Sequence, residues 1–426
     1  MVPILNYKLD DMTRVFSRTQ LDNSDFIKSV QDIISDVKEN KDKALFEYAK
    51  KFDKQDINEK NILVTEKEIK AAYRKVDKSM IQVIRKAKKN ILEYHKKQTK
   101  RFKNEFFSAG ANKQSTLGWI YRPLSRVGLY VPGGKASYPS TVMMTSLPAI
   151  AAGVDEVIVC TPNINNPLIL VACKECGIKK IYKVGGAQAV AAMAYGTESI
   201  ERVDLIAGPG NVFVTLAKKM VYGHVAIDMI AGPSEILCIA DNTADPKLLA
   251  ADLLSQAEHD ELAASFLVTN SLELAKKVQL ELERQANLLE RKDIINKSLE
   301  NNGTIILVDD MDMAIEVADR IAPEHLEICA NDAHEIALKL KNCGAIFVGN
   351  NSPEPLGDYF AGPSHVLPTS GSARFSSVLN VDTFMKKISY INYDKEDLVA
   401  ISDDIISLAE SEGFTAHANT IKIRKD

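Results

Sequence analysis

The first hundred residues of the chain combine many charged side chains with a helical spacing of apolar ones. Between about residues 22 and 103, apolar residues recur at intervals of four, three and four positions, at Met80, Ile84, Ala87 and Ile91. That spacing places the four side chains on one face of a helix. We therefore predict helices here that bury one face against another part of the molecule.

After Trp119 the pattern changes to short β-branched runs that alternate with helical segments rich in glycine and alanine. This alternation is typical of βαβ units built around a mostly parallel sheet. The predicted strands are 156–160, 180–184, 203–207 and 235–240, and the predicted helices are 166–176, 187–195 and 212–222.

A second α/β region follows from residue 246 to about 379, with predicted strands at 265–269, 304–308 and 345–348. The tail from residue 380 differs from both regions. It contains a polar segment, 395–410, that we predict to be a helix ended by Gly413, because glycine accepts the left-handed conformation found at helix ends. The fold class is therefore α/β.

The size and composition indicate a globular protein with more than one core. A chain of 426 residues exceeds what a single hydrophobic core usually supports, so we expect at least two packed units. Apolar residues make up 46% and charged residues 26%, with no run apolar enough to cross a bilayer. The apolar run at the N-terminus is too short to be the core of a signal peptide. We expect a cytoplasmic protein with no membrane partner.

Charge and cysteine usage exclude two further classes. The formal net charge of −4 gives no general attraction to nucleic acid. The six cysteines are scattered along the chain, which suits reduced thiols. Cys173 and Cys176 form one C-x-x-C pair without the second pair that a zinc finger needs. We therefore expect neither a nucleic-acid partner nor a disulfide framework.

Three glycine-rich turns are candidates for binding a nucleotide, although the chain has no P-loop and no G-x-G-x-x-G. They are YVPGG at 130–134, GGAQ at 185–188 and GPGN at 208–211. A turn that opens a helix leaves free N–H groups that can meet a phosphate. Each turn alone is also what a tight α/β connection requires. Three of them at successive strand ends favour a dinucleotide or phosphate site.

Gln256 and His259 form a candidate metal-binding pair. They lie three residues apart on a predicted helix whose buried face is Leu249, Leu253 and Ala257. At that spacing the two side chains share a polar face of one turn and can hold one cation. An exposed surface pair is the alternative.

Glu324 and His325 suit proton transfer. They follow Pro323 where a predicted helix ends and a β-like run begins. A neutral histidine is a natural general base, and an adjacent carboxylate can activate water. A histidine with a purely structural role remains the alternative.

Two further candidates lie near the end of the chain. The two prolines in PEPLGD, at 353–358, argue against a regular helix, so we predict that Asp358 lies in a loop, with His365 following. Asp358 would offer a hard oxygen ligand or would cap its own turn. Glu412 and His417 flank the end of the last predicted helix and form either a polar site or ordinary terminal surface.

At these residues the sequence resembles the histidinol dehydrogenase family over nearly its whole length. The matching segments are IDMIAGPSE at 227–235, LLSQAEH at 253–259, APEHLE at 322–327, GDY at 357–359, SHVLPT at 364–369, ARFSS at 373–377 and ESEG at 410–413 with His417. One position departs from the family pattern, since Ser370 stands where a glycine is expected.

The resemblance implies a zinc site and an NAD site. It assigns zinc to Gln256, His259, Asp358 and His417, and proton transfer to Glu324 and His325. It places L-histidinol, the substrate, against Ser234, Gln256, His259, His325, Asp358, His365, Glu412 and His417, and NAD against Tyr130, Gln188 and Asn211. The implied reaction oxidises L-histidinol through L-histidinal to L-histidine while two NAD are reduced, the last step of histidine biosynthesis.

The resemblance also implies two incomplete Rossmann-like domains with small N-terminal and C-terminal helical pieces. We expect an N-terminal arm at 1–22 and a first domain, carrying the metal and catalytic residues, from 23–127 with 237–379. An NAD-binding domain is expected at 128–236 and a C-terminal dimerisation segment at 380–426. The implied assembly is a homodimer in which Glu412 and His417 reach the other subunit's site.

Two other classes of function would use some of the same residues. A zinc hydrolase would also use an adjacent acid and imidazole beside a metal, although it would not need the glycine-rich turns. A metabolite-binding or scaffold protein would have to keep every one of these motifs without any chemistry. Formation of NADH from histidinol distinguishes the dehydrogenase from both.

Overall fold

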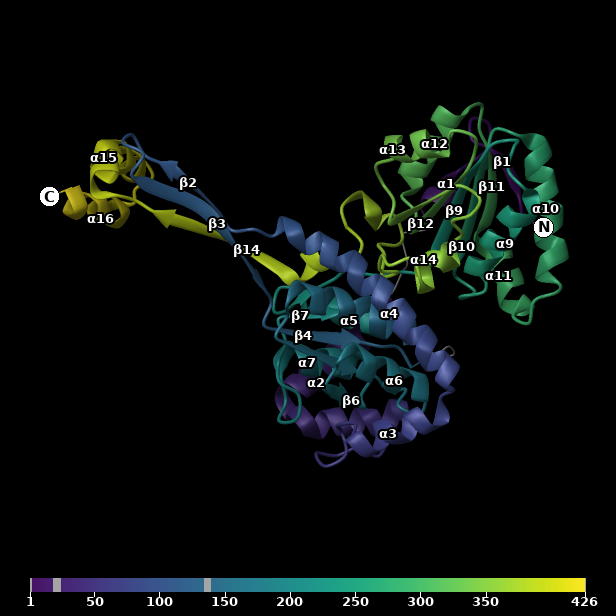
Figure 1. The fold of residues 1–426 in the computed structure, drawn as a ribbon, viewed down its shortest axis with the longest axis horizontal. Coiled ribbons are helices and arrows are strands. Elements are labelled where there is room, and N and C mark those ends of the chain that lie inside the picture. Colours follow the sequence, from purple (N-terminus) through teal and green to yellow (C-terminus); the bar gives the residue numbers. More distant parts are fainter. Residues whose placement is uncertain (1, 18–23, 134–138, 426) are drawn as a thin grey trace.

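The structure is a computed structural model that describes residues 2–17, 24–133 and 139–425 (Figure 1). Two parallel sheets organise most of the chain. The first sheet contains, in spatial order, β1 (Ile4–Asn6), β11 (Gly303–Leu307), β10 (Ala264–Thr269), β9 (Glu235–Ala240), β12 (His325–Cys329) and β13 (Ala345–Val348). The second contains β6 (Lys180–Tyr182), β5 (Glu156–Cys160), β4 (Arg126–Tyr130), β7 (Leu205–Ala207) and β8 (Ala226–Ile227).

Both sheets repeat the strand order of a Rossmann fold without its last strand. In the second sheet the chain runs outward from β4 through β5 to β6, then crosses back to β7 and β8. In the first it runs from β9 through β10 to β11, then crosses to β12 and β13. A connection that reverses direction in this way creates a switch point beside the first strand. The predicted α/β class with two incomplete Rossmann-like units is confirmed.

Helices cover both faces of each parallel sheet. On the first sheet, α9 (Pro246–Ala257), α10 (Leu272–Ala286) and α11 (Lys292–Asn302) form one apolar core, whereas α12 (Met311–Ile321) and α13 (Ala333–Lys339) form the other. On the second sheet, α5 (Pro139–Ala152) and α6 (Pro167–Cys176) lie on one face, with α7 (Gly186–Tyr195) and α8 (Val212–Val221) on the other. Short pieces are α1 (Thr13–Phe16), α14 (Glu354–Tyr359), η2 (Thr99–Arg101), η3 (Ser372–Arg374) and η4 (Val381–Phe384).

The N-terminal helices pack on the second sheet, which corrects the expected grouping of 23–127 with 237–379. Helix α2 (Ser24–Tyr48) packs on α7 and α8, while α3 (Glu66–Lys75) and α4 (Lys78–Gln98) pack on α6 and α5. The physical reason lies in α7, whose residues 187–194 are all buried. A helix that is apolar on every side needs an outer layer to cover it, and α2 supplies that layer.

Two other expected boundaries also differ. The arm predicted at 1–22 is part of the first sheet as far as the structure describes it, because β1 pairs in parallel with β11. The C-terminal segment forms a sheet with residues from the N-terminal half. In this sheet β14 (Met385–Asn392) pairs with β3 (Ser115–Pro123), and β3 pairs with β2 (Glu105–Ala109). This antiparallel ribbon leads to α15 (Lys395–Ser411) and α16 (Thr415–Lys425), which stand apart from both parallel sheets (Figure 1).

Candidate active site

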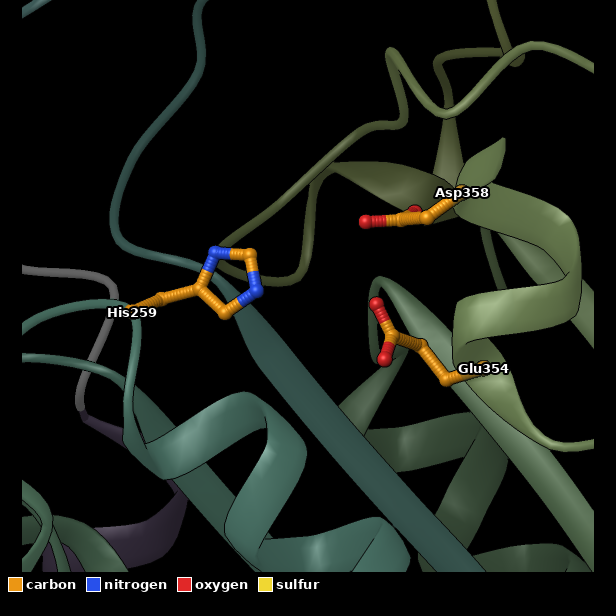
Figure 2. A group of neighbouring side chains, drawn as sticks. All are labelled: His259, Glu354 and Asp358. Atoms are coloured by element: carbon orange, nitrogen blue, oxygen red, sulfur yellow. The ribbon is translucent and has the colours of Figure 1, made fainter. Parts of the chain in front are cut away.

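His259, Glu354 and Asp358 form a group that could hold a cation. Glu354 and Asp358 are four residues apart on α14, so both side chains project from one face of that helix. His259 follows the end of α9 and faces them (Figure 2). One ligand atom from each of the three lies within 4.8 Å of the others.

The helix under this group corrects the expectation that Asp358 lies in a loop. Pro353 is the N-cap of α14, and Pro355 falls in its first turn. The first N–H groups of a helix have no partner within it, so proline is tolerated there although it would break the interior. The prolines therefore start this helix, and Asp358 is held on a rigid turn.

Gln256 lies in the last turn of α9 and is fully buried. The prediction that it shares a polar face with His259 is therefore wrong, because α9 ends at Ala257 and His259 lies in the turn that follows. Neither amide atom of Gln256 has a hydrogen-bond partner among the described residues. Burying an amide without a partner is costly, so the Gln256 amide is suited to bind a metal ion or another ligand.

Glu324 and His325 are both held by the backbone of β9. The N–H of Glu235 donates to Glu324 Oε2 over 2.9 Å, and the carbonyl oxygen of Glu235 lies 3.0 Å from His325 Nδ1. Since a carbonyl only accepts, Nδ1 carries a proton, and Nε2 is the ring nitrogen left to exchange a proton with a ligand. That Nε2 is buried and unpartnered, 3.8 Å from Asp358 Oδ1 and 4.0 Å from Glu354 Oε1.

Burial and mutual charge shift the pKa values of these groups. Burial raises the pKa of Glu324 to about 8, and burial together with the charge of Asp358 raises that of Glu354 to about 7. Burial alone would lower the pKa of His325, but the carboxylates around it raise that pKa to about 10. Strongly shifted groups in one place are typical of functional sites. The excess of carboxyl groups favours a bound cation.

Asp358 is the ionised centre of this arrangement. Burial would raise its pKa, but His325 and His365, with His259, lower it to about 2. His365 comes from the loop after α14, and its Nδ1 lies 3.2 Å from the backbone oxygen of Asp358. Its Nε2 lies 3.5 Å from Thr141 Oγ1 on α5, so this histidine joins the two parallel-sheet units.

The remaining residues expected at the metal and substrate sites divide into two groups. Ser234 lies just before β9, next to the residue that holds Glu324 and His325. Glu412 and His417 lie at the far end of the ribbon, well away from α9 and α14 in the same chain (Figure 1). His417 contacts Phe414, with ring centroids 5.0 Å apart.

The residues expected to bind NAD lie around the switch point of the second sheet. Tyr130 ends β4, and its buried hydroxyl accepts the N–H of Gly186 over 3.1 Å. Asn211 caps α8, where its side chain accepts the N–H groups of Phe213 and Val214. Of the turn at 130–134, Gly134 lies outside the described residues.

The turn before α7 has a partner that the sequence did not indicate. Asp53, at the end of η1 (Ala49–Asp53), accepts the N–H of Gly185 over 3.3 Å and the amide of Gln188 over 3.4 Å. Burial raises the pKa of this carboxyl. The carboxyl group of Asp53 thus occupies the N-terminus of α7, the position where we predict that a phosphate could bind.

A cavity of about 420 Å³ lies next to the cation group. Its apolar wall comes from α4 and α5, including Met80 and Met143, and its other wall includes His259 and Tyr359. Met80 faces this space together with Ile84 and Ala87, but Met80 is partly exposed, whereas Ile84, Ala87 and Ile91 are buried beneath α4. The cavity connects the helices of the second sheet to the candidate active site.

Comparison with known proteins decides the family. A family model described as histidinol dehydrogenase matches residues 16–425. The histidinol dehydrogenase of Clostridium acetobutylicum is 54% identical over 407 residues, covering 95% of this chain and 93% of its own. The chain belongs to the histidinol dehydrogenase family. It is accordingly an oxidoreductase by family.

Other members of the histidinol dehydrogenase family agree in sequence and in structure. That of Caldanaerobacter subterraneus is 53% identical over 414 residues, covering 96% of this chain and 95% of its own. The crystal structure of histidinol dehydrogenase from Elizabethkingia anophelis superposes with a TM-score of 0.91 at 37% identity, covering 99% of this chain and 98% of that one. Among the described residues, no helix is long and apolar enough to cross a membrane.

Ser370, where the resemblance predicts a glycine, has an unusual backbone conformation. Ser370 adopts a φ of +55°, which is in the left-handed region where glycine is favoured. Its hydroxyl lies 2.4 Å from where a Cβ on Gly232 would stand. Serine at this position is therefore strained, in a loop packed against the segment that leads to Ser234.

Proposed function

We propose that this chain is a zinc-dependent, NAD-linked L-histidinol dehydrogenase. It would oxidise L-histidinol through L-histidinal to L-histidine and reduce two NAD, the last step of histidine biosynthesis. The observation that carries the proposal is the convergence of an unpartnered buried base, His325, with the group of His259 and Asp358. Family membership supports the choice of substrate and cofactor.

The side chains at the site fit a zinc ion. Gln256, His259 and Asp358 would hold it within one chain, and the unpartnered amide of Gln256 supports this. One neutral amide, one carboxylate and imidazole ligands leave the ion a net positive charge and room for substrate donors. When bound, zinc would supply Lewis acidity that holds and polarises the substrate.

His325 would serve as the base for the alcohol. Its Nε2 takes the hydroxyl proton while the substrate carbon gives its hydride to NAD. Nδ1 stays bonded to the carbonyl oxygen of Glu235, which fixes the ring and the tautomer. In the loaded site the charge of Asp358 would be largely neutralised. The pKa of His325 would then fall toward the range in which an imidazole exchanges protons near neutral pH.

Glu324 would serve in the second oxidation, for which the aldehyde must first add water. Its carboxylate takes a proton from that water as the water oxygen bonds to the aldehyde carbon, and the hydrate then gives a second hydride to another NAD. Burial of Glu324 favours this role, because a carboxyl group with a raised pKa is a stronger base when ionised. The products are one carboxylate, two NADH and three protons for each histidinol.

NAD would lie along the carboxyl ends of the second sheet. Tyr130, Gln188 and Asn211 stand beside the switch point, the usual place for a dinucleotide in such sheets. The cavity that includes Met143 and His259 would let the reactive ring approach the substrate.

The site would be completed by a second copy of the chain. The ribbon and its two terminal helices carry Glu412 and His417 away from their own site (Figure 1). A homodimer in which each tail reaches the other protomer would bring the partner subunit's His417 and Glu412 to that site, in keeping with two-fold symmetry.

The test is to mix the pure protein with L-histidinol, zinc and NAD and to follow absorbance at 340 nm. The proposal expects close to two NADH per histidinol, loss of turnover with a strong chelator, and recovery with zinc, manganese or cobalt, since such ions share N and O ligands. Hydrolysis of a substrate without NADH would instead identify a zinc hydrolase. Full activity in metal-free protein would rule out the zinc requirement.

A further inference from the structure

A pair of carboxyl groups, one buried and one half-buried, lies behind the candidate active site and has no role in the proposed reaction. Glu327 is 2% exposed, and its carboxyl is hydrogen-bonded to that of Asp252. Glu327 Oε1 also accepts the backbone N–H of Glu354 over 2.6 Å. We refer to Asp252 and Glu327 as the acid pair.

The acid pair connects the three elements that carry the site. Asp252 lies on α9, one turn before Gln256. Glu327 lies on β12, two residues after His325, so the two side chains share one face of the strand. The N–H group of Glu354 begins α14, the helix that carries Asp358.

We propose that Glu327, bonded to Asp252, is a positioning residue that holds α9, β12 and α14 in the register that the metal and catalytic groups require. The inference deepens the proposed function and rests on it. Asp252 and Glu327 touch neither substrate nor metal in this arrangement. They act through the elements that carry Gln256, His325 and Asp358.

The chemistry of the acid pair explains why two carboxyl groups can stand together. Two ionised carboxylates in hydrogen-bonding contact would repel each other. The pair therefore holds one proton, which forms the hydrogen bond between them. Burial and the charge of Asp252 raise the pKa of Glu327, in agreement with a proton on Glu327. Its other oxygen remains available to the N–H of Glu354, and the Sγ of Cys238 lies 3.6 Å from Oε2.

Glutamine and leucine at position 327 separate positioning from simple packing. Glu327→Gln keeps a donor for Asp252 and an acceptor for the N–H of Glu354, whereas Glu327→Leu fills the space and bonds to neither. Groups behind metal ligands typically change metal affinity by ~10- to 100-fold when they are lost. We therefore expect Glu327→Leu to weaken zinc binding by that factor, and Glu327→Gln to stay within a few-fold of wild type.

Ile328→Ala is the matched control. Ile328 is fully buried on the same strand but on the opposite face, in the core under α12. Its truncation should lower the melting temperature and leave zinc affinity unchanged. Zinc affinity is measured by competition with a chromogenic chelator, and melting by circular dichroism, for each full-length protein.

Three results would overturn the inference. The first is zinc affinity in Glu327→Leu equal to that of wild type, and the second is a loss in Glu327→Gln as large as in Glu327→Leu. If Glu327→Leu does not fold, Asp252→Ala reaches the same pair from a half-exposed helix position, and unchanged zinc affinity there is the third. Zinc binding and NADH formation by the wild type are measured first, so a failure of the proposed function appears there and not in the differences between variants.

Discussion

Five buried side-chain atoms of the described chain lack a hydrogen-bond partner, and four of them belong to Gln256, His325 and Glu354. Buried polar atoms are nearly always paired, so a cluster of exceptions in one place indicates a missing ligand. The fifth atom, Nε2 of His95, lies on α4. At the scale of single residues, unsatisfied atoms therefore locate the site independently of any motif.

Glu324→Gln should separate the two oxidations. The variant keeps size and polarity but loses the carboxylate that would activate water, so it should oxidise histidinol to the aldehyde and stall near one NADH per substrate. Losing a general base typically costs ~10²- to 10⁴-fold in the affected step. Single-turnover absorbance at 340 nm measures the yield. Conversion of added aldehyde at the wild-type rate would show that Glu324 is not the base.

His325→Asn should slow the first oxidation as well, because the hydroxyl proton has lost its acceptor. The expected loss is again ~10²- to 10⁴-fold, now in the rate of the first NADH. Zinc affinity should change little, since His325 is not expected to be a ligand. A normal first turnover in this variant would assign the alcohol proton to another group.

Gly208→Ala should disrupt the turn between β7 and α8. Gly208 has a φ of +115°, and a Cβ there would stand 2.2 Å from the backbone oxygen of Tyr130. Gly223→Ala is the control, because Gly223 also has a positive φ, +97°, but nothing within 4 Å of a Cβ. Both should lose ~1 kcal/mol for conformation, and only Gly208→Ala should lose more and bind NAD less tightly. Equal urea midpoints for the two variants would contradict this.

At the scale of elements, hydrophobic patterning located most of the parallel strands. The predicted strands 156–160, 235–240 and 345–348 coincide with β5, β9 and β13. Each is a continuous run rich in β-branched and other apolar residues, although only β9 is buried along its whole length and β13 is half-buried or exposed. The ribbon strands β2, β3 and β14 were not predicted. They have mostly exposed or half-buried side chains, so neither a buried run nor a strict alternation marks them.

Glu354 is the site residue that sequence reasoning missed. Its signal is the i, i+4 spacing to Asp358, but that spacing has meaning only on a helix, and the two prolines argue against a regular helix. Proline excludes a helix interior and is tolerated in the first turn, so PEPLGD was compatible with both structures. The partners of Glu354 come from segments far away in sequence, such as Ser255 at 3.1 Å.

Lys218→Met should destabilise the turn that α8 helps to hold. Lys218 and Asp228 form an ion pair that is almost completely buried. Both side chains are hydrogen-bonded to the backbone of Gly208. Lys218 donates to its carbonyl oxygen, and Asp228 accepts its N–H. Removing one partner leaves an uncompensated buried charge, which costs about 3–5 kcal/mol. Urea unfolding should show this loss, and Lys218→Met with Asp228→Asn should recover part of it. Equal losses of unfolding free energy in the single and double variants would show that the two side chains do not stabilise each other.

At the scale of the whole molecule, the two parallel sheets present different ends to the site. The second sheet offers the carboxyl ends of its strands, where Tyr130 and the Gly208 turn lie. The first sheet offers amino ends, since His325 begins β12 and Ser234 precedes β9. The sequence located these residues relative to their strands. It could not show which sheet edges face each other, because that depends on packing between the units.

The C-terminal helices leave the chain's own core and expose apolar side chains. Leu408 on α15 is 67% exposed, and Phe414, in the turn between Glu412 and α16, is 52% exposed. Apolar side chains gathered on a projecting segment usually face a partner. A tail that reaches another protomer would cover them and deliver His417 at the same time.

The proposed sharing of the site between protomers gives a quantitative prediction. His259→Ala and His417→Ala should each be nearly inactive, because each removes a ligand from both sites of its homodimer. When the two variants are unfolded together and refolded, half of the dimers should be mixed. In a mixed dimer one site lacks both histidines and the other lacks neither, so about one quarter of wild-type activity should return.

The control for this experiment is a mixture of the two variants that is never unfolded, which should stay inactive if protomers do not exchange. Differently tagged variants, purified through both tags after refolding, isolate the mixed dimers, which should have about half the wild-type activity and half its tightly bound zinc. Mixed dimers that form but have no activity would place His417 in its own subunit's site. In that case the ribbon and its terminal helices would have to fold back over α9 and α14, far from where they lie in Figure 1.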